Sequence, residues 1–565
     1  MSQRNVVRSR VCLVAAVALS IYINGCGGGS PATPMQPGFQ ISASALSPAP
    51  VTLGSAATST VKIQAVNGFS GTIGLACAGL PSAANCSFNP SSVASSGTSQ
   101  LTVSTAANTV PGSYSFNVQA SSGATQNSAP LTLAVQSLIQ HVVIIFQENR
   151  TPDNLFQDPI LIQRGADIQN YGINSLGQTI PLAPGPLATV YDLDHSHKAF
   201  VEMYDGGKMD GADKITISCE KGALNCPPPN PQFVYTSPSD VGPYFALAET
   251  YTFGDRMFQT NQGPSFPSHQ FIISGTSAPS AGSNDFVAEN PISQTVNAFG
   301  LAGCISPPDE TVALIDPSGS ESTTIYPCFD HPTLTDELNT KSISWRYYAN
   351  SAGIIWNAPN AIEHMCVPNV APPNGTSCTG SDWTNNVVLH SAKVLTDIQS
   401  GSLPSVTWII PDGLESDHAH GNDGSGPSWV ASVVNAIGNS PYWANTAIFI
   451  AWDDWGGWYD HVAPPINSAN AYEYGFRVPL IVVSPYAKAA YISHTPHHFG
   501  SILKYIEGTF GLPSLGFADA DSLADDFSDC FDYSQTPLKF QTIPAQYDAA
   551  HFIEDKRPPT DPDDD

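Results

Sequence analysis

Nearly continuous apolar runs recur in the chain from residue 139 onward, as expected for strands that are covered on both faces. Between and after them, apolar positions in residues 430–437 and 502–510 keep helical spacing and stop at Gly438 and Gly511. Strands and helices in alternation predict an α/β fold with a mostly parallel sheet and helices on both faces. The four expected strands are residues 141–146, 406–410, 446–451 and 480–483.

A different pattern covers residues 39–137. Short segments with alternating apolar and polar positions, such as 59–65, 99–104 and 114–120, lie between clusters of Pro, Gly, Ser and Asn. This pattern predicts a small N-terminal β-sandwich, followed by a catalytic domain at 138–565.

Two stretches inside the second domain lack this regularity. Residues 157–240 and 277–400 are rich in loops, Pro and Cys, and we expect them to be insertions that build a substrate pocket.

The N-terminus predicts export. Three arginines in the first ten residues precede the apolar run 11–23, which is typical of a signal peptide over residues 1–26. Its ending, Ile23-Asn24-Gly25-Cys26, is similar to a lipobox, so a lipid anchor in the cell envelope and plain secretion are the two expectations. Residues 27–38 form a Gly-, Pro- and Ser-rich linker.

Cysteine usage fits an exported chain. Nine of the 11 cysteines lie beyond Cys26, and eight of them fall as near neighbours that predict local disulfides, with Cys530 left over. The expected pairs are Cys77 with Cys86, Cys219 with Cys226, Cys304 with Cys328, and Cys366 with Cys378.

The charge balance argues against nucleic acid as a partner. The chain has 20 basic and 48 acidic residues, a net charge of −28, which repels a phosphate backbone.

Polar clusters follow the expected strands, where open α/β sheets hold their ligands. Gln147-Glu148-Asn149-Arg150, Asp417-His418, and Asp453-Asp454 come after the first three strands, and Lys488 and residues 494–498 after the fourth. Two adjacent carboxylates repel each other unless a cation or shared protons offset the charge, so a metal site is the leading hypothesis. The alternative is a solvated Asp-Gly turn.

A nucleophile is available in Gly263-Pro264-Ser265-Phe266-Pro267-Ser268-His269. Ser265 precedes a helix expected at 269–274, where the positive end of the helix dipole favours an anionic phosphoryl group. The alternative is a serine that only caps the helix.

Four blocks in this order resemble the bacterial phosphoesterase family, which contains phospholipases C and an acid phosphatase and has an alkaline-phosphatase-like core. The resemblance covers residues 138–515, while residues 67–88 resemble immunoglobulin-like modules of bacterial surface proteins. The blocks are HVVIIFQENRTPDNLF, GDRMFQTNQGPSFPSHQFIISGTS, WDDWGGWYDHVAPP and GFRVPLIVVSPYAKAAYISHTPHHFGSILKYIEGTFGL.

The resemblance implies roles for individual residues. A divalent ion (Ca, Mg, Mn or Zn) would be held by Glu148, Asn149, Ser265, Asp453 and Asp454. Ser265 would attack phosphorus, and the catalytic histidines would be His195, His418, His494 and His498. The family commonly has Asn where this chain has Ser268.

The predicted function is metal-assisted hydrolysis of phosphate esters, a phospholipid among them, through a phosphoseryl intermediate, as in a phospholipase C or an acid phosphatase. A sulfatase-like or phosphotransferase activity is an alternative within the superfamily, although the segment around Ser265 lacks the Arg of the sulfatase motif. The alternative of another class is a surface adhesion lipoprotein with an inactive phosphatase-like core.

Overall fold

The computed structural model describes residues 36–106, 109–293, 302–466 and 472–560. The expected signal peptide and lipobox (1–26), residues 27–35 of the linker, and the acidic C-terminal residues 561–565 lie outside the described residues. None of the described helices is both long and apolar enough to cross a membrane.

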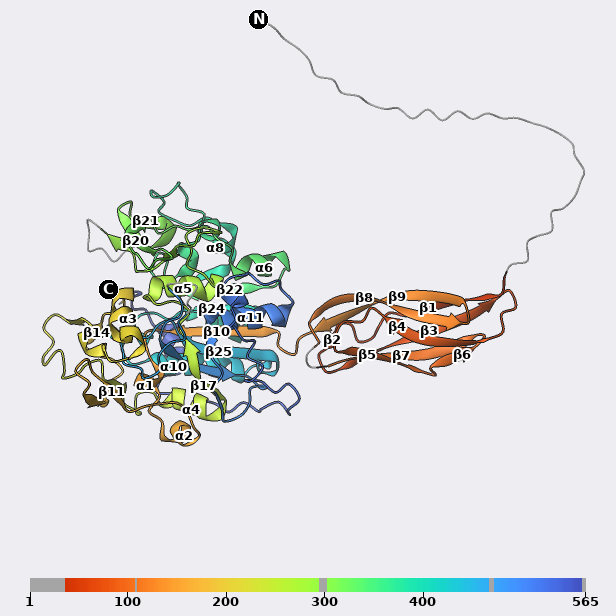
Figure 1. Cartoon of the computed structure of the whole chain (residues 1–565), viewed down its shortest axis with the longest axis horizontal. Helices are drawn as coiled ribbons and strands as arrows, with labels where there is room; N and C mark the ends of the chain where they lie inside the picture. Colours follow the sequence, from red (N-terminus) through yellow and green to blue (C-terminus); the bar gives the residue numbers. More distant parts are fainter. Residues whose placement is uncertain (1–35, 107–108, 294–301, 467–471, 561–565) are drawn as a thin grey trace, which may run out of the picture.

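The first unit consists of two β-sheets (Figure 1). Buried side chains from both sheets form one core. Buried and exposed positions alternate along β3 and β8, because each strand turns one face to the core and the other to water. The three alternating segments expected here lie in β3, β7 and β8, which confirms them as strands. One sheet has the order β1 (Gly38–Ala43), β3 (Ala56–Val66), β7 (Gly97–Thr105), β5 (Ala84–Asn89); the other has β2 (Val51–Thr52), β9 (Thr125–Gln136), β8 (Gly112–Ser122), β4 (Thr72–Ala78), β6 (Ser92–Ala94).

All four expected disulfides are present, and Cys530 is the free cysteine among the described residues. Cys77–Cys86 joins β4 to β5 and so ties the two sheets of the first unit together.

The second unit is built on a mixed sheet of nine strands (Figure 1). Eight strands run in one direction, and β26 alone runs against its neighbours β25 and β17. The sheet order is β23 (Val387–Leu389), β22 (Trp345–Ala349), β24 (Val406–Ile409), β10 (His141–Gln147), β25 (Thr446–Trp452), β26 (Arg477–Val483), β17 (Thr252–Phe258), β27 (Tyr491–Ser493), with β28 (His497–His498) also paired to β17.

The four apolar runs are confirmed as β10, β24, β25 and β26, but the expectation for the end of β26 is wrong. Because β26 is antiparallel to β25, its last residues lie at the opposite edge from Asp453. The chain returns to the polar edge through β27 and β28, which pair in parallel with β17. Part of the expected second insertion is also sheet, since β22 and β23 extend it beyond β24.

Helices cover both faces of this sheet. The ring of Phe449 on β25 packs on Tyr505 of α11 (Phe499–Phe510), at 5.0 Å between centroids. Trp452, three residues later and hence on the other face, packs on Tyr244 of α4 (Gly242–Thr250) at 5.1 Å. Helix α5 (Ser265–Ser274) packs with α11, whereas α10 (Gly426–Gly438), α9 (Lys393–Gln399) and α12 (Ala549–Glu554) pack on the side of α4.

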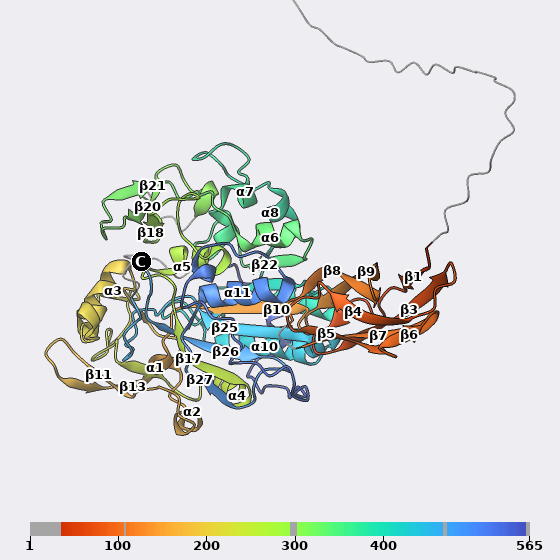
Figure 2. The ribbon, with the colours of Figure 1, turned by 45° about the vertical axis from the view of Figure 1, so that its right-hand side comes forward.

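The two insertions form separate groups of short elements beside the sheet, gold and green in Figure 2. Helix α1 (Pro152–Leu155) precedes the first insertion, which contains α2 (Pro159–Gln163), β11 (Tyr171–Ile173), β12 (Thr179–Pro181), β13 (Ala183–Gly185), β14 (Tyr191–Leu193), α3 (His197–Tyr204), β15 (Ile217–Cys219) and β16 (Val234–Thr236). The second contains β18 (Phe286–Val287), β19 (Ile292–Ser293), β20 (Glu310–Ile315), β21 (Thr323–Ile325), α6 (Leu334–Thr340), α7 (Glu363–Cys366) and α8 (Ser381–Asn386).

The packing of β25 on α11 predicts a large effect of truncation. Phe449 is fully buried against three aromatic rings, so Phe449→Ala is expected to lower the free energy of unfolding of this unit by about 3–5 kcal/mol. Urea denaturation followed by tryptophan fluorescence measures it. Leu224→Ala, at a side chain that is 86% exposed, is the control and should change stability by less than about 0.5 kcal/mol.

Candidate active site

The register of β10 and β25 brings two acidic segments together. Gln147 lies opposite Trp452 in this parallel ladder, so Glu148-Asn149 and Asp453-Asp454 leave the sheet side by side. The backbone N–H of Asp453 donates to the Gln147 carbonyl (2.9 Å), and the N–H of Asn149 donates to Asp453 Oδ1 (3.1 Å). All four side chains of the two pairs are fully buried.

The two loops approach so closely that glycine is required. Asn149 has a φ of 63°, and its carbonyl oxygen would lie 2.4 Å from a Cβ placed on Gly456, whose φ is also positive. A Cβ on Gly457 would lie 2.4 Å from Leu193. The Gly-Gly pair is therefore part of the site's architecture and not only a turn.

Ser265 reaches this cluster from α5. Its hydroxyl donates to Asp454 Oδ2 at 3.2 Å, and it is the first residue of the helix, which begins four residues earlier than expected. The first-turn N–H groups are largely engaged: that of Phe266 donates to Asn290 Oδ1 (2.9 Å), that of Ser268 to the Pro264 carbonyl, and Pro267 has none. The Ser268 hydroxyl donates to the Asp453 carbonyl (2.6 Å), so it holds the acidic loop.

Sequence reasoning missed His269 as a site residue. Its Nε2 lies 3.4 Å from Glu148 Oε1 and 3.7 Å from Asp453 Oδ2, and all three side chains are fully buried. His269 lies four residues after Ser265 and hence on the same face of α5, which is the signal that was available once the helix start was known. Glu148, His269 and Asp453 are grouped closely enough to hold a metal ion.

His195 lies on the same side of the cluster, in the turn between β14 and α3. Its Nδ1 donates to the Leu193 carbonyl (2.8 Å), so its Nε2 accepts, here from the Asn149 amide at 3.0 Å. The same Nε2 lies 3.9 Å from Asp454 Oδ2. The first insertion therefore contributes a histidine directly to the acidic cluster.

The His418 ring lies next to that of His195, with 5.8 Å between centroids. Asp417 fixes the loop: its Oδ2 accepts from Tyr244 (2.7 Å) and from the indole of Trp452 (3.0 Å). Burial raises the pKa of Asp417 to about 6. His418 Nε2 is buried and has no hydrogen-bond partner among the described residues.

The structure separates His498 from His494. His498 is buried at the start of α11, and its Nδ1 accepts from the Gly500 N–H (3.2 Å), so its Nε2 carries the proton. Burial lowers the pKa of His498 to about 4. The His494 side chain is 55% exposed and lies 2.8 Å from Asp255 Oδ2, so the structure does not bring it into the cluster.

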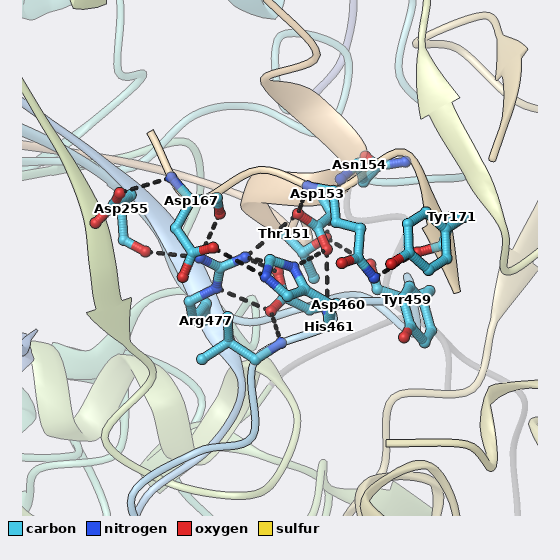
Figure 3. A network of polar contacts seen from close by, with 12 residues as sticks. Thr151, Asp153, Asn154, Asp167, Tyr171, Asp255, Tyr459, Asp460, His461 and Arg477 are labelled. Carbon is cyan, nitrogen blue, oxygen red and sulfur yellow. Dashed lines mark hydrogen bonds and ion pairs between the residues drawn. The ribbon is translucent and has the colours of Figure 1, made fainter. Parts of the chain in front are cut away.

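A second acidic group, drawn in Figure 3, lies beside the site but has a cation of its own. The buried Arg477 guanidinium donates to both oxygens of Asp460 (2.8 and 2.9 Å), and His461 lies 2.7 Å from Asp153 Oδ2. These contacts join the loop after β25 to helix α1 after β10. Asp460 and His461 therefore have structural partners within the chain.

The Glu148, Asp453 and Asp454 carboxylates have a different environment. Buried carboxylates are costly unless a cation compensates them, and the partners here include histidines, a hydroxyl and the backbone N–H groups of Asn149 and Gly456. The nearby Arg150 guanidinium turns away, to carbonyls of Asp417 (2.7 Å) and Leu187 (2.8 Å). Asp453 Oδ2 and Asn149 Oδ1 accept no hydrogen bond from described residues, so the donor set fits a divalent cation.

A hydroxyl among buried carboxylates, at the carboxyl ends of parallel strands, is typical of α/β enzymes that bind a metal ion. The chain belongs to the Phosphoesterase family, whose model matches residues 139–513.

Three curated relatives are phospholipases C. The chain is similar to Hemolytic phospholipase C of Pseudomonas aeruginosa, with 23% identity over 66% of this chain and 53% of the relative. It is also similar to Phospholipase C B of Mycobacterium tuberculosis (24%; 71% and 78%) and to Non-specific phospholipase C6 of Arabidopsis thaliana (25%; 71% and 74%). The chain spans about half the length of the Pseudomonas relative.

Glu289 lies close to the nucleophile loop and gives a pH-dependent prediction. Burial, and then the charge of Glu321, raise the pKa of Glu289 from 4.5 to about 8. Since the folded state binds this proton more tightly than the unfolded state, Glu289 lowers stability as pH rises from about 4.5 to 8. Glu289→Gln should reduce that decline by roughly 2–4 kcal/mol.

Urea denaturation at pH 5 and pH 8 checks this difference. Burial also raises the pKa values of Glu415 and Glu507 to about 8. These two residues therefore contribute the same pH dependence of stability to wild type and to Glu289→Gln. Parallel declines in wild type and variant would contradict the raised pKa of Glu289.

Proposed function

We propose that this chain is an exported, metal-dependent phosphoric ester hydrolase of the phospholipase C type that works through a phosphoseryl intermediate on Ser265. The observation that carries the proposal is the Ser265 hydroxyl, 3.2 Å from Asp454 Oδ2, among three buried carboxylates at the ends of β10 and β25. The alkaline-phosphatase type of core, the lipid anchor and the immunoglobulin-like spacer are parts of the same proposal.

The chain's own groups suit nucleophilic attack on phosphorus. Ser265 directs its proton toward Asp454, and its oxygen lies at the positive end of α5. Glu148, Asn149, Asp453, Asp454 and Ser265 would hold the divalent ion, and His269 is positioned to join Glu148 and Asp453. When bound, such an ion lowers the pKa of a ligating hydroxyl and neutralises phosphoryl oxygens.

The histidines divide the remaining tasks. His195 Nε2 accepts a hydrogen bond in the cluster, and His418 Nε2 is buried beside it, so this pair is suited to move a proton to or from the leaving alcohol. His498 is neutral at physiological pH and offers an N–H, so it would donate a hydrogen bond to a phosphoryl oxygen. His494 has no part in this scheme.

The relatives' names favour a phosphodiester, with phospholipid as the leading substrate class. The alternative of an adhesion protein with an inactive core has no support from the site, because the nucleophile, the acidic cluster and the buried histidines are all present together. Acid phosphatase activity differs only in the ester attacked, so a phosphomonoester is the second substrate to test.

Ser265→Ala should abolish turnover of both a phosphorylcholine diester and a chromogenic phosphomonoester, a loss of at least about 1,000-fold in kcat, because the attacking oxygen is gone. The matched control is Ser274→Ala on the same helix, whose buried hydroxyl has no hydrogen-bond partner among the described residues. It should retain activity within about threefold. Activity untouched by Ser265→Ala would refute the mechanism, and turnover of the diester alone would identify a phospholipase and exclude a phosphatase.

Removal of divalent ions with a chelator should abolish turnover, and re-addition of a divalent ion should restore it. Asp453→Asn removes one negative charge from the donor set, so it should raise the ion concentration needed for half-maximal activity by about tenfold or more. Full activity of wild type in excess chelator would contradict a metal-dependent reaction.

A further inference from the structure

We propose that His497, Asp529 and Cys530 form a second metal site, selective for zinc, at the edge of the main sheet. The three residues form a group separate from the acidic cluster, and their ligand atoms are grouped closely enough to hold an ion. His497 comes from β28, whereas Asp529 and Cys530 lie in the segment that follows α11. The site would therefore join two separate segments.

The distances come close to the ligand spacing of a tetrahedral zinc ion. Cys530 Sγ lies 3.9 Å from His497 Nε2 and 3.4 Å from Asp529 Oδ1, and Nε2 lies 4.0 Å from Oδ1. With zinc–ligand bonds of about 2.0–2.3 Å and tetrahedral angles, ligand atoms stand roughly 3.3–3.6 Å apart. The two longer distances would have to shorten by about half an ångström for all three ligand atoms to reach this spacing.

The neighbours of His497 orient its imidazole ring for metal binding. Its Nδ1 lies 2.6 Å from Asp525 Oδ1, so Nδ1 donates and Nε2 faces the thiol. A carboxylate behind the imidazole is the usual second partner of a metal-bound histidine. The Phe527 ring stacks on His497 at 4.5 Å and fixes its plane.

The ligand types distinguish this site from the acidic cluster. Cys530 is fully buried and is the free cysteine of the described chain. A soft sulfur with an imidazole and one carboxylate favours zinc over calcium or magnesium. The Asp529 side chain is 23% exposed, which gives an ion a path from solvent. The Ser493 hydroxyl lies 3.0 Å from His497 Nε2 and donates to Asp529 Oδ2, so an ion would replace its contact with Nε2.

The site would anchor the segment that carries His498. His497 immediately precedes His498, which caps α11, and Cys530 follows the loop packed on that helix. Since a metal bound only by the folded chain stabilises it, zinc would raise the thermal midpoint without touching substrate. An ordinary salt bridge of His497 with Asp525 and Asp529 is the competing explanation.

Cobalt binding to the full chain separates the two explanations. After chelation and dialysis, Co²⁺ should give a thiolate-to-cobalt charge-transfer band in the near ultraviolet in wild type and in Asp454→Asn. The band should be absent in Cys530→Ser, which keeps Cys12 and Cys26 and thereby controls for them. No band in wild type, or an unchanged band in Cys530→Ser, would overturn the proposal.

A second variant guards against misfolding of Cys530→Ser. Asp525→Asn keeps all three ligands and removes the carboxylate behind His497, so zinc affinity measured by competition with a chromogenic chelator should fall by about 10–100-fold. Unchanged affinity would contradict the assignment. The outcome is independent of the proposed hydrolase activity, because Ser265→Ala should bind zinc here as wild type does.

Discussion

Three buried carboxylates set the main constraint on this molecule. Glu148, Asp453 and Asp454 leave two neighbouring parallel strands at the same level, and each is fully buried. Buried like charges that lie close together raise the energy of the folded state unless their surroundings compensate them. The positive φ of Asn149, the absence of side chains at Gly456 and Gly457 and the Ser268 hydroxyl all serve to hold these groups in place.

The neighbouring network of Arg477 shows how the fold treats carboxylates that need no ion. Asp460 and Asp153 receive a guanidinium and an imidazole within hydrogen-bond distance, so their charges are matched by the chain itself (Figure 3). This network joins the segments that follow the two acidic pairs of the cluster. One acidic group is thus compensated by the chain itself, whereas the donor set of the other fits a divalent cation.

Hydrophobic patterning predicted much of this arrangement. The runs of β10, β24 and β25 are fully buried, and a polar pair directly after such a run has to lie at the sheet edge. Strand direction could not be predicted in this way, because an apolar run has the same pattern in a parallel and an antiparallel strand. The end of β26 was therefore expected at the wrong edge of the sheet. Strands β17 and β22 were missed since Asp255 and Arg346 interrupt their apolar pattern.

The placement of the histidines depends on tertiary contacts that cannot be predicted from the sequence pattern. His494 and His498 belong to one short segment, and only the pairing of β28 with β17 decides which is buried. His269 was missed because two prolines obscured the start of α5. The resemblance to the family did supply His195 and His418, which lie far apart in the chain and meet ring to ring.

The placement of the disulfides has a consequence for producing the protein. Cys219–Cys226, Cys304–Cys328 and Cys366–Cys378 all fasten the two insertions, and the fourth lies in the first unit. No described disulfide crosses the nine-stranded sheet. A reducing host cytosol would therefore remove no crosslink from the sheet and its acidic cluster, while the two insertions would lose theirs.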